Sequence, residues 1–400
     1  MRWRVVGALV LIVVALGAVN YLRPIPPVSA TALLPAADHV PGTAPTLPWP
    51  ASGSAAVGVS GLGLIASSGN EQAIPAASVT KVMTGLIVLE DHKLKKGESG
   101  PTITITDADV QSYQSDLQEQ QSVVRVVAGE PLTELQLLQG MLIPSANNFA
   151  ETLARWDAGS PASIDPFVAK MNARAAALHL THTKFADVSG ASAGSVSTPS
   201  DLVALGMLAM KDEVFADVVG KAQVDLPVAG TVVNVNGLVG HNGVIGIKTG
   251  SGLNTGANYL FAATATIDNH VITVFGCVMG QPTLAVSFDS AKALIAAMTA
   301  VLHVRRVISR NQSIATYTTP WGDQTDLVAT VDLDLAEWPG MLVRQHLNAS
   351  SIVIEKPLPS STQEGSEHVV LGDYVEDVPL VTADPMYPPG RVWRLTRLSL

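Results

Sequence analysis

The sequence predicts a mixed α and β protein with an antiparallel sheet and accompanying helices, followed by a smaller β-rich domain. Two apolar runs, 258–267 and 271–279, flank a turn-forming Asp-Asn pair, as neighbouring antiparallel strands do. The run 79–89 is apolar almost all the way round, which is typical of a helix packed inside a domain. Beyond Arg305 only short alternating runs follow, which indicate the strands of a second domain.

Composition limits the classes of function. Four hundred residues with 47% hydrophobic and 14% charged side chains are enough for a large ordered core. The formal net charge of -10 provides no basic surface, so no nucleic-acid partner is expected. The single cysteine, Cys277, excludes an internal disulfide framework, and its apolar neighbours indicate a small core residue. The histidines show no zinc-ligand spacing, and neither a metal nor another cofactor is expected.

The N-terminal segment 1–23 has the pattern of an export signal. Arg2 and Arg4 precede an uncharged apolar run from residue 5 to 19, which fits the core of a signal peptide. If Tyr21 and Leu22 extend the run, residues 5–22 fit a short membrane anchor. Small residues at 28–30 (Val-Ser-Ala) resemble a cleavage site, so removal and retention both stay open. We therefore expect the rest of the chain outside the cytoplasm, either secreted or attached to the cell envelope.

The remaining chain is expected to form a linker and two domains. Eight prolines in the segment 24–50 predict an extended, semi-rigid spacer that holds the body away from the membrane. The main body is expected at 51–303 and the β-rich C-terminal domain at 304–400.

Within the main body, short strands are expected around residues 56–66, directly before the apolar helix. A polar, Gln-rich section at 111–121 is expected to run over the surface. Residues 132–138 have helical spacing with Thr133 as the cap, and a helix from about 288 to 302 closes the body.

Ser78 and Lys81 begin the apolar helix and form the first chemical motif. Because they are three residues apart, they lie on the same helical face. Burial disfavours an ammonium and lowers its pKa, which would make Lys81 a base for the Ser78 hydroxyl. The N–H groups at the helix start also favour an oxyanion near Ser78. Alternatively, Ser78 only caps the helix and Lys81 extends to the surface.

Ser145 and Asn147 form a second motif, in a short loop between two predicted helices. Pro144 ends the first helix, and helical spacing resumes at Phe149. Such a loop can direct Ser145 to relay a proton to a leaving group, and the Asn147 amide to orient a lysine and a substrate carbonyl. The alternative is a loop in which both residues only cap helix N–H groups.

A predicted strand ends in the third motif, Lys248-Thr249-Gly250-Ser251. Gly250 would permit the close approach of a ligand backbone, and Lys248 and Thr249 can hold a carboxylate. The backbone N–H of Ser251, with that of Ser78, can supply the two donors of an oxyanion hole. An ordinary strand end is the alternative interpretation.

The motifs Ser-x-x-Lys, Ser-x-Asn and Lys-Thr-Gly occur in the order that penicillin-interacting serine enzymes share. From residue 51 to 302 the chain resembles the serine-type D-alanyl-D-alanine carboxypeptidases, which are low-molecular-mass penicillin-binding proteins of the β-lactamase/transpeptidase-like superfamily. The resemblance implies an antiparallel sheet covered by helices, with the site at the boundary between them. It implies as substrate a peptidoglycan stem peptide ending in D-Ala-D-Ala, a Ser78 acyl-enzyme, and inhibition by β-lactams.

Two departures from the family pattern, Ala146 and Gly252, leave the fine substrate preference open. One alternative is a class A-like β-lactamase, which needs a glutamate between the second and third motifs. Residues 152–212 contain none, and Glu213 comes late in the order, so rapid penicillin hydrolysis is disfavoured. A non-catalytic penicillin-sensing or wall-binding module is the other alternative.

Overall fold

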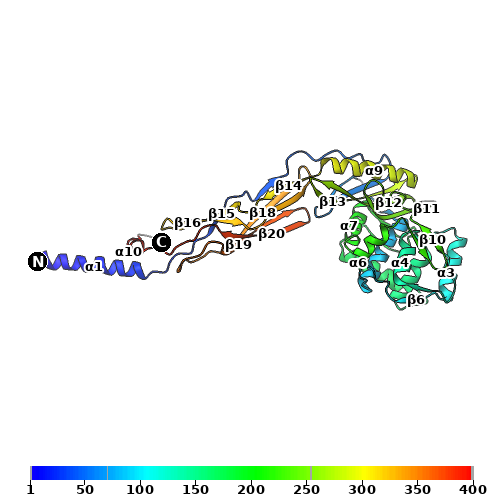
Figure 1. Ribbon diagram of the computed structural model, residues 1–400, viewed down its shortest axis with the longest axis horizontal. Coiled ribbons are helices and arrows are strands. Elements are labelled where there is room, and N and C mark those ends of the chain that lie inside the picture. Colours follow the sequence, from blue (N-terminus) through cyan, green and yellow to red (C-terminus); the bar gives the residue numbers. More distant parts are fainter. Residues whose placement is uncertain (1, 70, 253–254, 398–400) are drawn as a thin grey trace. The chain divides into compact units, whose positions relative to one another are not determined.

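The computed structural model describes residues 2–69, 71–252 and 255–397, which divide into two compact units. One unit runs from Pro45 to Leu302, and the other combines Met1–Ala44 with His303–Leu400. Residue 1 of the expected N-terminal segment and residues 398–400 of the expected C-terminal domain lie outside the described residues. Figure 1 gives the elements of each unit.

The unit formed by residues 45–302 contains a five-stranded sheet whose neighbouring strands are all antiparallel. The turn between its two longest strands is formed by Asp268 and Asn269, which both have positive φ (47° and 66°), as a tight hairpin requires. This confirms the antiparallel pairing that the sequence predicts. In spatial order the strands are β11 (Val244–Gly252), β12 (Gly256–Ile267), β13 (His270–Gln281), β3 (Ser54–Val59) and β4 (Gly63–Ser67).

Helices cover both faces of this sheet, because side chains of each strand alternate between two apolar cores. Phe275, Cys277 and Met279 of β13 join the larger core, which also includes residues of α2 and α7. On the other face, the ring of Tyr259 meets Phe288 of α9 edge-on, with centroids 5.0 Å apart. Figure 1 shows α9 and α7 on opposite sides of β12 and β13.

The remaining elements of this unit are mostly helical. The helices are α2 (Lys81–Asp91), α3 (Asp107–Gln118), α4 (Glu134–Leu142), α5 (Asn147–Asp157), α6 (Asp165–Ala177), α7 (Pro199–Ala209), α8 (Glu213–Val219), α9 (Leu284–Val301) and the 3₁₀ helix η1 (Ala77–Thr80). Short antiparallel pairs are formed by β5 (Ile74–Pro75) with β8 (Val196–Ser197), β6 (Thr102–Thr104) with β7 (Pro131–Thr133), and β9 (Gln223–Leu226) with β10 (Gly230–Val233).

Two helices of this unit, α3 and α4, begin with capping boxes. Thr133 caps α4 as predicted, in a capping box with Gln136. The polar section at 111–121 lies at the surface as expected, since none of its residues is buried, but most of it is helix, because α3 extends to Gln118. Thr106 and Asp109 form a capping box that begins this helix without the need for a wide apolar stripe.

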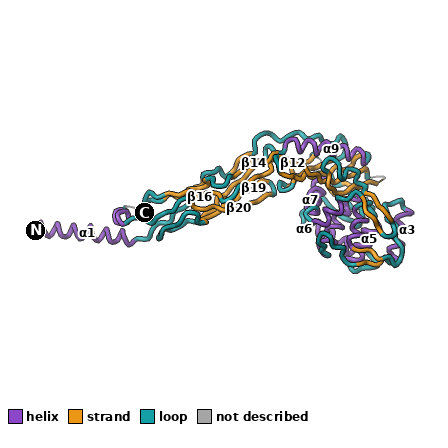
Figure 2. The backbone as a smooth tube through the Cα atoms, viewed as in Figure 1, coloured by secondary structure: helices purple, strands orange, loops and turns teal. Residues whose placement is uncertain are grey.

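The other unit is built on a seven-stranded antiparallel sheet, with strands drawn in orange in Figure 2. Its strands in spatial order are β1 (Ala30–Ala32), β15 (Ser313–Thr318), β16 (Gln324–Ala329), β20 (Tyr374–Thr382), β19 (Gln363–Leu371), β18 (Leu342–Ala349) and β2 (Ala37–His39). A separate pair is formed by β14 (His303–Ile308) and β17 (Leu333–Glu337), and the helices are α1 (Arg2–Leu22) and α10 (Arg391–Thr396).

The proline-rich segment 24–50 differs from the expected spacer. Its residues 30–32 and 37–39 form β1 and β2, the two edge strands of the seven-stranded sheet. An edge strand uses hydrogen bonds on one side only, and the prolines of the segment fall outside both three-residue strands. The expected linker is thus divided, with 24–44 in this unit and 45–50 in the other.

Candidate active site

Ser78 and Lys81 lie at the junction of η1 and α2, rather than both in one regular helix. Ser78 is in the 3₁₀ turn, and the Lys81 N–H donates to its carbonyl oxygen. The Lys81 side chain is fully buried, which excludes the alternative that it extends to the surface. Its Nζ lies 3.0 Å from Ser78 Oγ, so the structure brings the two predicted groups into direct contact.

Two further acceptors surround the buried amine of Lys81. Asn147 Oδ1 lies 2.6 Å from Nζ, and the main-chain oxygen of Ser189 lies 2.7 Å away. Burial, and then the charge of Lys248, hold the pKa of Lys81 well below its usual range, and nearby carboxylates, that of Asp187 first, only partly offset this. The site therefore favours an uncharged amine next to a serine hydroxyl.

The second motif lies in the loop between α4 and α5. Ser145 is buried and has a φ of 71°, a left-handed conformation that a serine rarely adopts. Asn147 is the first residue of α5, and its backbone N–H donates to the Ser122 carbonyl at 2.8 Å. The neighbouring Asn148 side chain forms two hydrogen bonds with the backbone of Val124. Its Oδ1 accepts from the Val124 N–H at 3.1 Å, and its Nδ2 donates to the Val124 carbonyl oxygen at 2.9 Å. These bonds fix the start of α5, from which the Asn147 side chain reaches the lysine.

The third motif lies on the edge strand β11, and its contact with η1 depends on Gly250. A Cβ at this position would be 2.9 Å from both the carbonyl oxygen of Ala76 and the backbone nitrogen of Ser78. The space that a Cβ of Gly250 would need is filled by the chain's own η1 backbone, and the approach of a ligand backbone to Gly250 stays a prediction. The same contact places β11 directly against the Ser78 turn.

The other residues of the third motif differ in exposure. Lys248 and Thr249 are buried, whereas Ser251 is exposed near the end of β11. Lys248 Nζ donates to the carbonyl oxygen of Thr249 at 3.1 Å. Burial lowers the pKa of Lys248 to about 7, so the amine binds its proton only weakly at neutral pH. An anion that approaches would favour the charged form.

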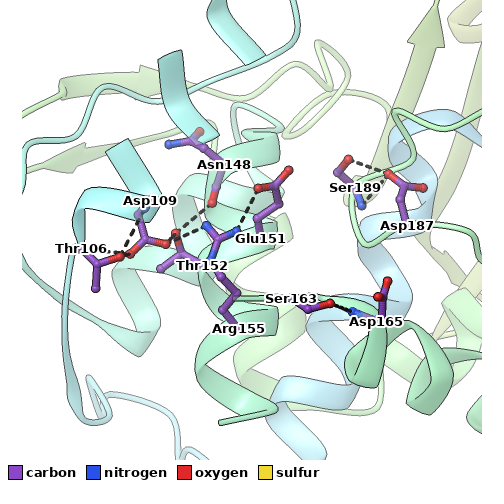
Figure 3. A network of polar contacts seen from close by, with 10 residues as sticks. All are labelled: Thr106, Asp109, Asn148, Glu151, Thr152, Arg155, Ser163, Asp165, Asp187 and Ser189. Atoms are coloured by element: carbon purple, nitrogen blue, oxygen red, sulfur yellow. Dashed lines mark hydrogen bonds and ion pairs between the residues drawn. The ribbon is translucent and has the colours of Figure 1, made fainter. Parts of the chain in front are cut away.

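A loop at residues 187–191 completes the surroundings of the lysine, and the sequence motifs do not include it. The Asp187 carboxylate accepts hydrogen bonds from the backbone N–H groups of Ser189, Gly190 and Ala191, at 3.2, 2.8 and 2.9 Å. A Cβ at Gly190 would lie 1.8 Å from the carbonyl oxygen of Ala77, so the loop packs directly on η1. Figure 3 shows Asp187 bound to Ser189 in this loop.

A polar network connects α3 with α5, the helix that begins at Asn147 (Figure 3). Asp109 accepts from Thr152 and Arg155, both at 2.8 Å, and Arg155 also donates to Glu151 at 3.1 Å. Burial alone would raise the pKa of Asp109, but these bonds and those from Thr106 hold it below its ordinary value. The charged carboxylate therefore ties α3 to the helix that begins at Asn147.

In residues 2–69, 71–252 and 255–397, no group of three or more His, Cys, Asp or Glu side chains is placed to hold a metal ion.

Comparison with known proteins points to one family. The family profile described as D-alanyl-D-alanine carboxypeptidase, Peptidase_S11, matches residues 57–283. The chain is 34% identical over 203 residues to the D-alanyl-D-alanine carboxypeptidase of Streptomyces sp. (strain K15), covering 47% of this chain and 67% of that protein. It is 26% identical over 348 residues to the D-alanyl-D-alanine carboxypeptidase DacC of Escherichia coli, covering 83% and 84% of the two chains.

The fold is similar to that of a solved structure. The crystal structure of the Streptomyces K15 DD-transpeptidase matches with a TM-score of 0.56 and 26% sequence identity, and it covers 65% of this chain and 100% of that chain.

Proposed function

We propose that this chain, which belongs to the Peptidase_S11 family of D-alanyl-D-alanine carboxypeptidases, uses Ser78 as its nucleophile and Lys81 as the base. The protein is a serine-type, penicillin-binding carboxypeptidase. It removes the terminal D-alanine from peptidoglycan stem peptides that end in D-Ala-D-Ala. The observation that supports these roles best is the buried Lys81 amine, held between Ser78 Oγ, Asn147 Oδ1 and the Ser189 carbonyl.

The three neighbours of Lys81 suit a neutral amine. An uncharged amine has two N–H donors and one lone pair. Asn147 Oδ1 and the Ser189 carbonyl oxygen can only accept, so they take both N–H groups. The lone pair is then left facing the Ser78 hydroxyl, whose proton it receives as Oγ attacks the carbonyl carbon of the penultimate D-alanine.

The negative charge that develops on the substrate oxygen needs donors at fixed positions. The backbone N–H groups of Ser78 and Ser251 form this oxyanion hole in our proposal, with β11 held against η1 through Gly250. Lys248 and Thr249 bind the terminal carboxylate of the substrate. Ser145 passes the proton from Lys81 to the nitrogen of the departing D-alanine, and water then hydrolyses the ester on Ser78.

The two lysines have different protonation requirements, which predicts a bell-shaped dependence of kcat/KM on pH. Lys81 must lose its proton, so the rate rises as pH increases through its lowered pKa. Lys248 must keep its proton to bind a carboxylate, so the rate falls as pH rises through about 7. We expect the fall to be mainly in KM, measured as D-alanine release between pH 5 and 9. A profile that stays flat to pH 9 would contradict the role of Lys248.

An experiment with penicillin tests the proposed function against its alternatives. The purified protein is incubated with benzylpenicillin and with a D-Ala-D-Ala peptide, while intact mass and free D-alanine are followed. We expect a persistent adduct of one penicillin on Ser78, together with D-alanine release from the peptide. Rapid turnover of penicillin would identify a β-lactamase, and a stable adduct without D-alanine release would identify a sensor.

The place of action follows from the substrate. Peptidoglycan lies outside the cytoplasm, so the enzyme acts at the cell envelope. The apolar helix over Trp3–Leu22 is long enough to cross a membrane, which is compatible with export or anchoring. We assign catalysis to the expected domain 51–303, and we expect the β-rich domain 304–400 to support it without contributing catalytic groups.

A further inference from the structure

The backbone carbonyl groups at the C-terminal end of α1 accept hydrogen bonds from Arg397, near the other end of the chain. Pro24 has no N–H, so it cannot give the carbonyl oxygen of Asn20 its usual helical hydrogen bond. The Arg397 guanidinium supplies this bond twice, from Nε at 3.1 Å and from Nη2 at 2.8 Å. It also donates to the carbonyl oxygens of Arg23 and Pro24, at 2.6 and 2.9 Å. A cation is favoured here by the negative end of the helix dipole.

Arg397 follows α10, and that helix packs along the last turns of α1. A Cβ at Gly17 would lie 3.6 Å from Leu395 Cδ2, in ordinary van der Waals contact. The Arg394 guanidinium lies 4.6 Å from the ring centroid of Tyr21. The contacts therefore involve both the side chains and the backbone of the final turns.

The helix α10 also packs against the turn between β15 and β16. Trp393 of α10 meets Trp321, which lies between β15 and β16, edge-on at 5.3 Å. Trp321 Nε1 also donates to the Tyr387 carbonyl at 2.9 Å. Thus α10 connects the end of α1 to the folded unit.

The residues that resemble a cleavage site also belong to this fold. Val28 is 3% exposed and exchanges two backbone hydrogen bonds with Ile352, at 2.8 and 2.9 Å. Ser29 Oγ lies 2.7 Å from Ser351 Oγ, and Ala30 pairs with Tyr317 as the first residue of β1. A cut after Ala30 would remove these contacts.

The same cut would also affect Arg397. This residue is only 7% exposed, and its four hydrogen bonds to residues 20–24 would all be lost. The cut would thus remove the partners of Arg397 and the neighbouring residues that shield it from water, and α10 would lose its contact with the end of α1. Residues 20–24 therefore form part of the folded unit through Arg397, which is unexpected for a segment that is cleaved off.

We propose that α1 is not removed, that it stays as the membrane anchor of the mature enzyme, and that α10 locks onto its outer end. The 21 residues of α1 extend over about 30 Å, which is the thickness of the hydrocarbon layer. Its large apolar side chains are all exposed in the fold, and a lipid bilayer is the partner that covers them. Arg2 and Arg4 keep the N-terminus in the cytoplasm, and Trp393 lies at the headgroup level.

Cysteine cross-linking in membranes tests this proposal with a matched control. The full chain is produced with Gly17→Cys and Leu395→Cys, and the control combines Leu395→Cys with Gly7→Cys. Gly7 lies on the same helix with nothing within 4 Å of its Cβ position. After mild oxidation and peptide mapping, we expect the 17–395 disulfide in at least tenfold excess over the 7–395 disulfide. Equal or negligible yields of the two would overturn the proposal.

Two further measurements keep the test independent of the cysteine variants. The intact mass of the unaltered chain, extracted from membranes, must include α1, and a mature chain that begins after Ala30 would refute retention. Arg397→Ala is expected to lower the 17–395 yield several-fold, whereas Arg310→Ala, an exposed arginine of the same unit, leaves it unchanged. Release of D-alanine by each variant shows separately that the catalytic unit is folded and active.

Discussion

Replacement of Lys81 by methionine is expected to slow acylation of Ser78 by about 10,000-fold. Methionine has a similar length but neither an N–H group nor a basic lone pair, so the Ser78 hydroxyl loses its proton acceptor. Asn147 Oδ1 and the Ser189 carbonyl also lose their donor, which costs about 1 kcal/mol for each buried acceptor. We therefore expect a folded, moderately destabilised protein that still binds substrate.

The second-order rate of labelling by benzylpenicillin and the rate of D-alanine release measure this effect. Ser78→Ala gives the background, because it cannot form an acyl-enzyme. Lys211→Met, at an exposed lysine, is the control and should keep wild-type rates. If Lys81→Met retained more than a tenth of the wild-type rate, another group would have to be the base. Thermal unfolding of each variant separates loss of chemistry from loss of fold.

Gly250→Ala is expected to reduce both rates by about 100-fold, although Gly250 carries no functional group. The added Cβ would lie 2.9 Å from the Ala76 carbonyl oxygen and from the Ser78 nitrogen, and 3.1 Å from the Val79 nitrogen. All three are backbone atoms that cannot turn aside, so β11 must move away from η1. The Ser251 N–H and the Lys248 ammonium would then move away from the positions beside Ser78 in which we propose that they act.

Gly237→Ala is the matched control for this substitution. A Cβ at Gly237 would meet only Phe288 Cε2, at the ordinary distance of 3.7 Å, so we expect wild-type rates. Labelling by benzylpenicillin is again the direct measurement, with circular dichroism to check the fold. Wild-type labelling of Gly250→Ala would mean that β11 does not lie against the Ser78 turn in solution.

The contact of Lys81 with Ser78 and Asn147 could be predicted from the sequence, because side-chain chemistry and spacing indicate these residues. The carbonyl of Ser189 could not, since every residue has a main-chain oxygen and only the fold selects one. A weak signal was present in Asp187-Val-Ser-Gly, a pattern typical of a tight turn. The turn gave no indication that it would pack against residues 77–81, more than a hundred positions earlier.

The sequence also did not predict the helix α3 or the strands β1 and β2, and each has a physical cause. The helix α3 is polar on most of its surface, and it depends on a capping box and on the contact of Asp109 with Arg155, neither of which hydrophobic periodicity reports. The strands β1 and β2 are set by pairing with β15 and β18, which come about 300 residues later. Three-residue edge strands between prolines have no periodic pattern of their own.

The pairing of β1 and β2 has a consequence for the order of folding during export. Both edges of the seven-stranded sheet come from the first 44 residues, whereas the strands between them follow residue 302. The early segments emerge first and have no partners until the entire catalytic unit has crossed the membrane. We therefore expect the catalytic unit to fold independently and first, while the sheet assembles late. Deleting residues 24–44 would expose longer strands as new edges and make the protein prone to aggregate.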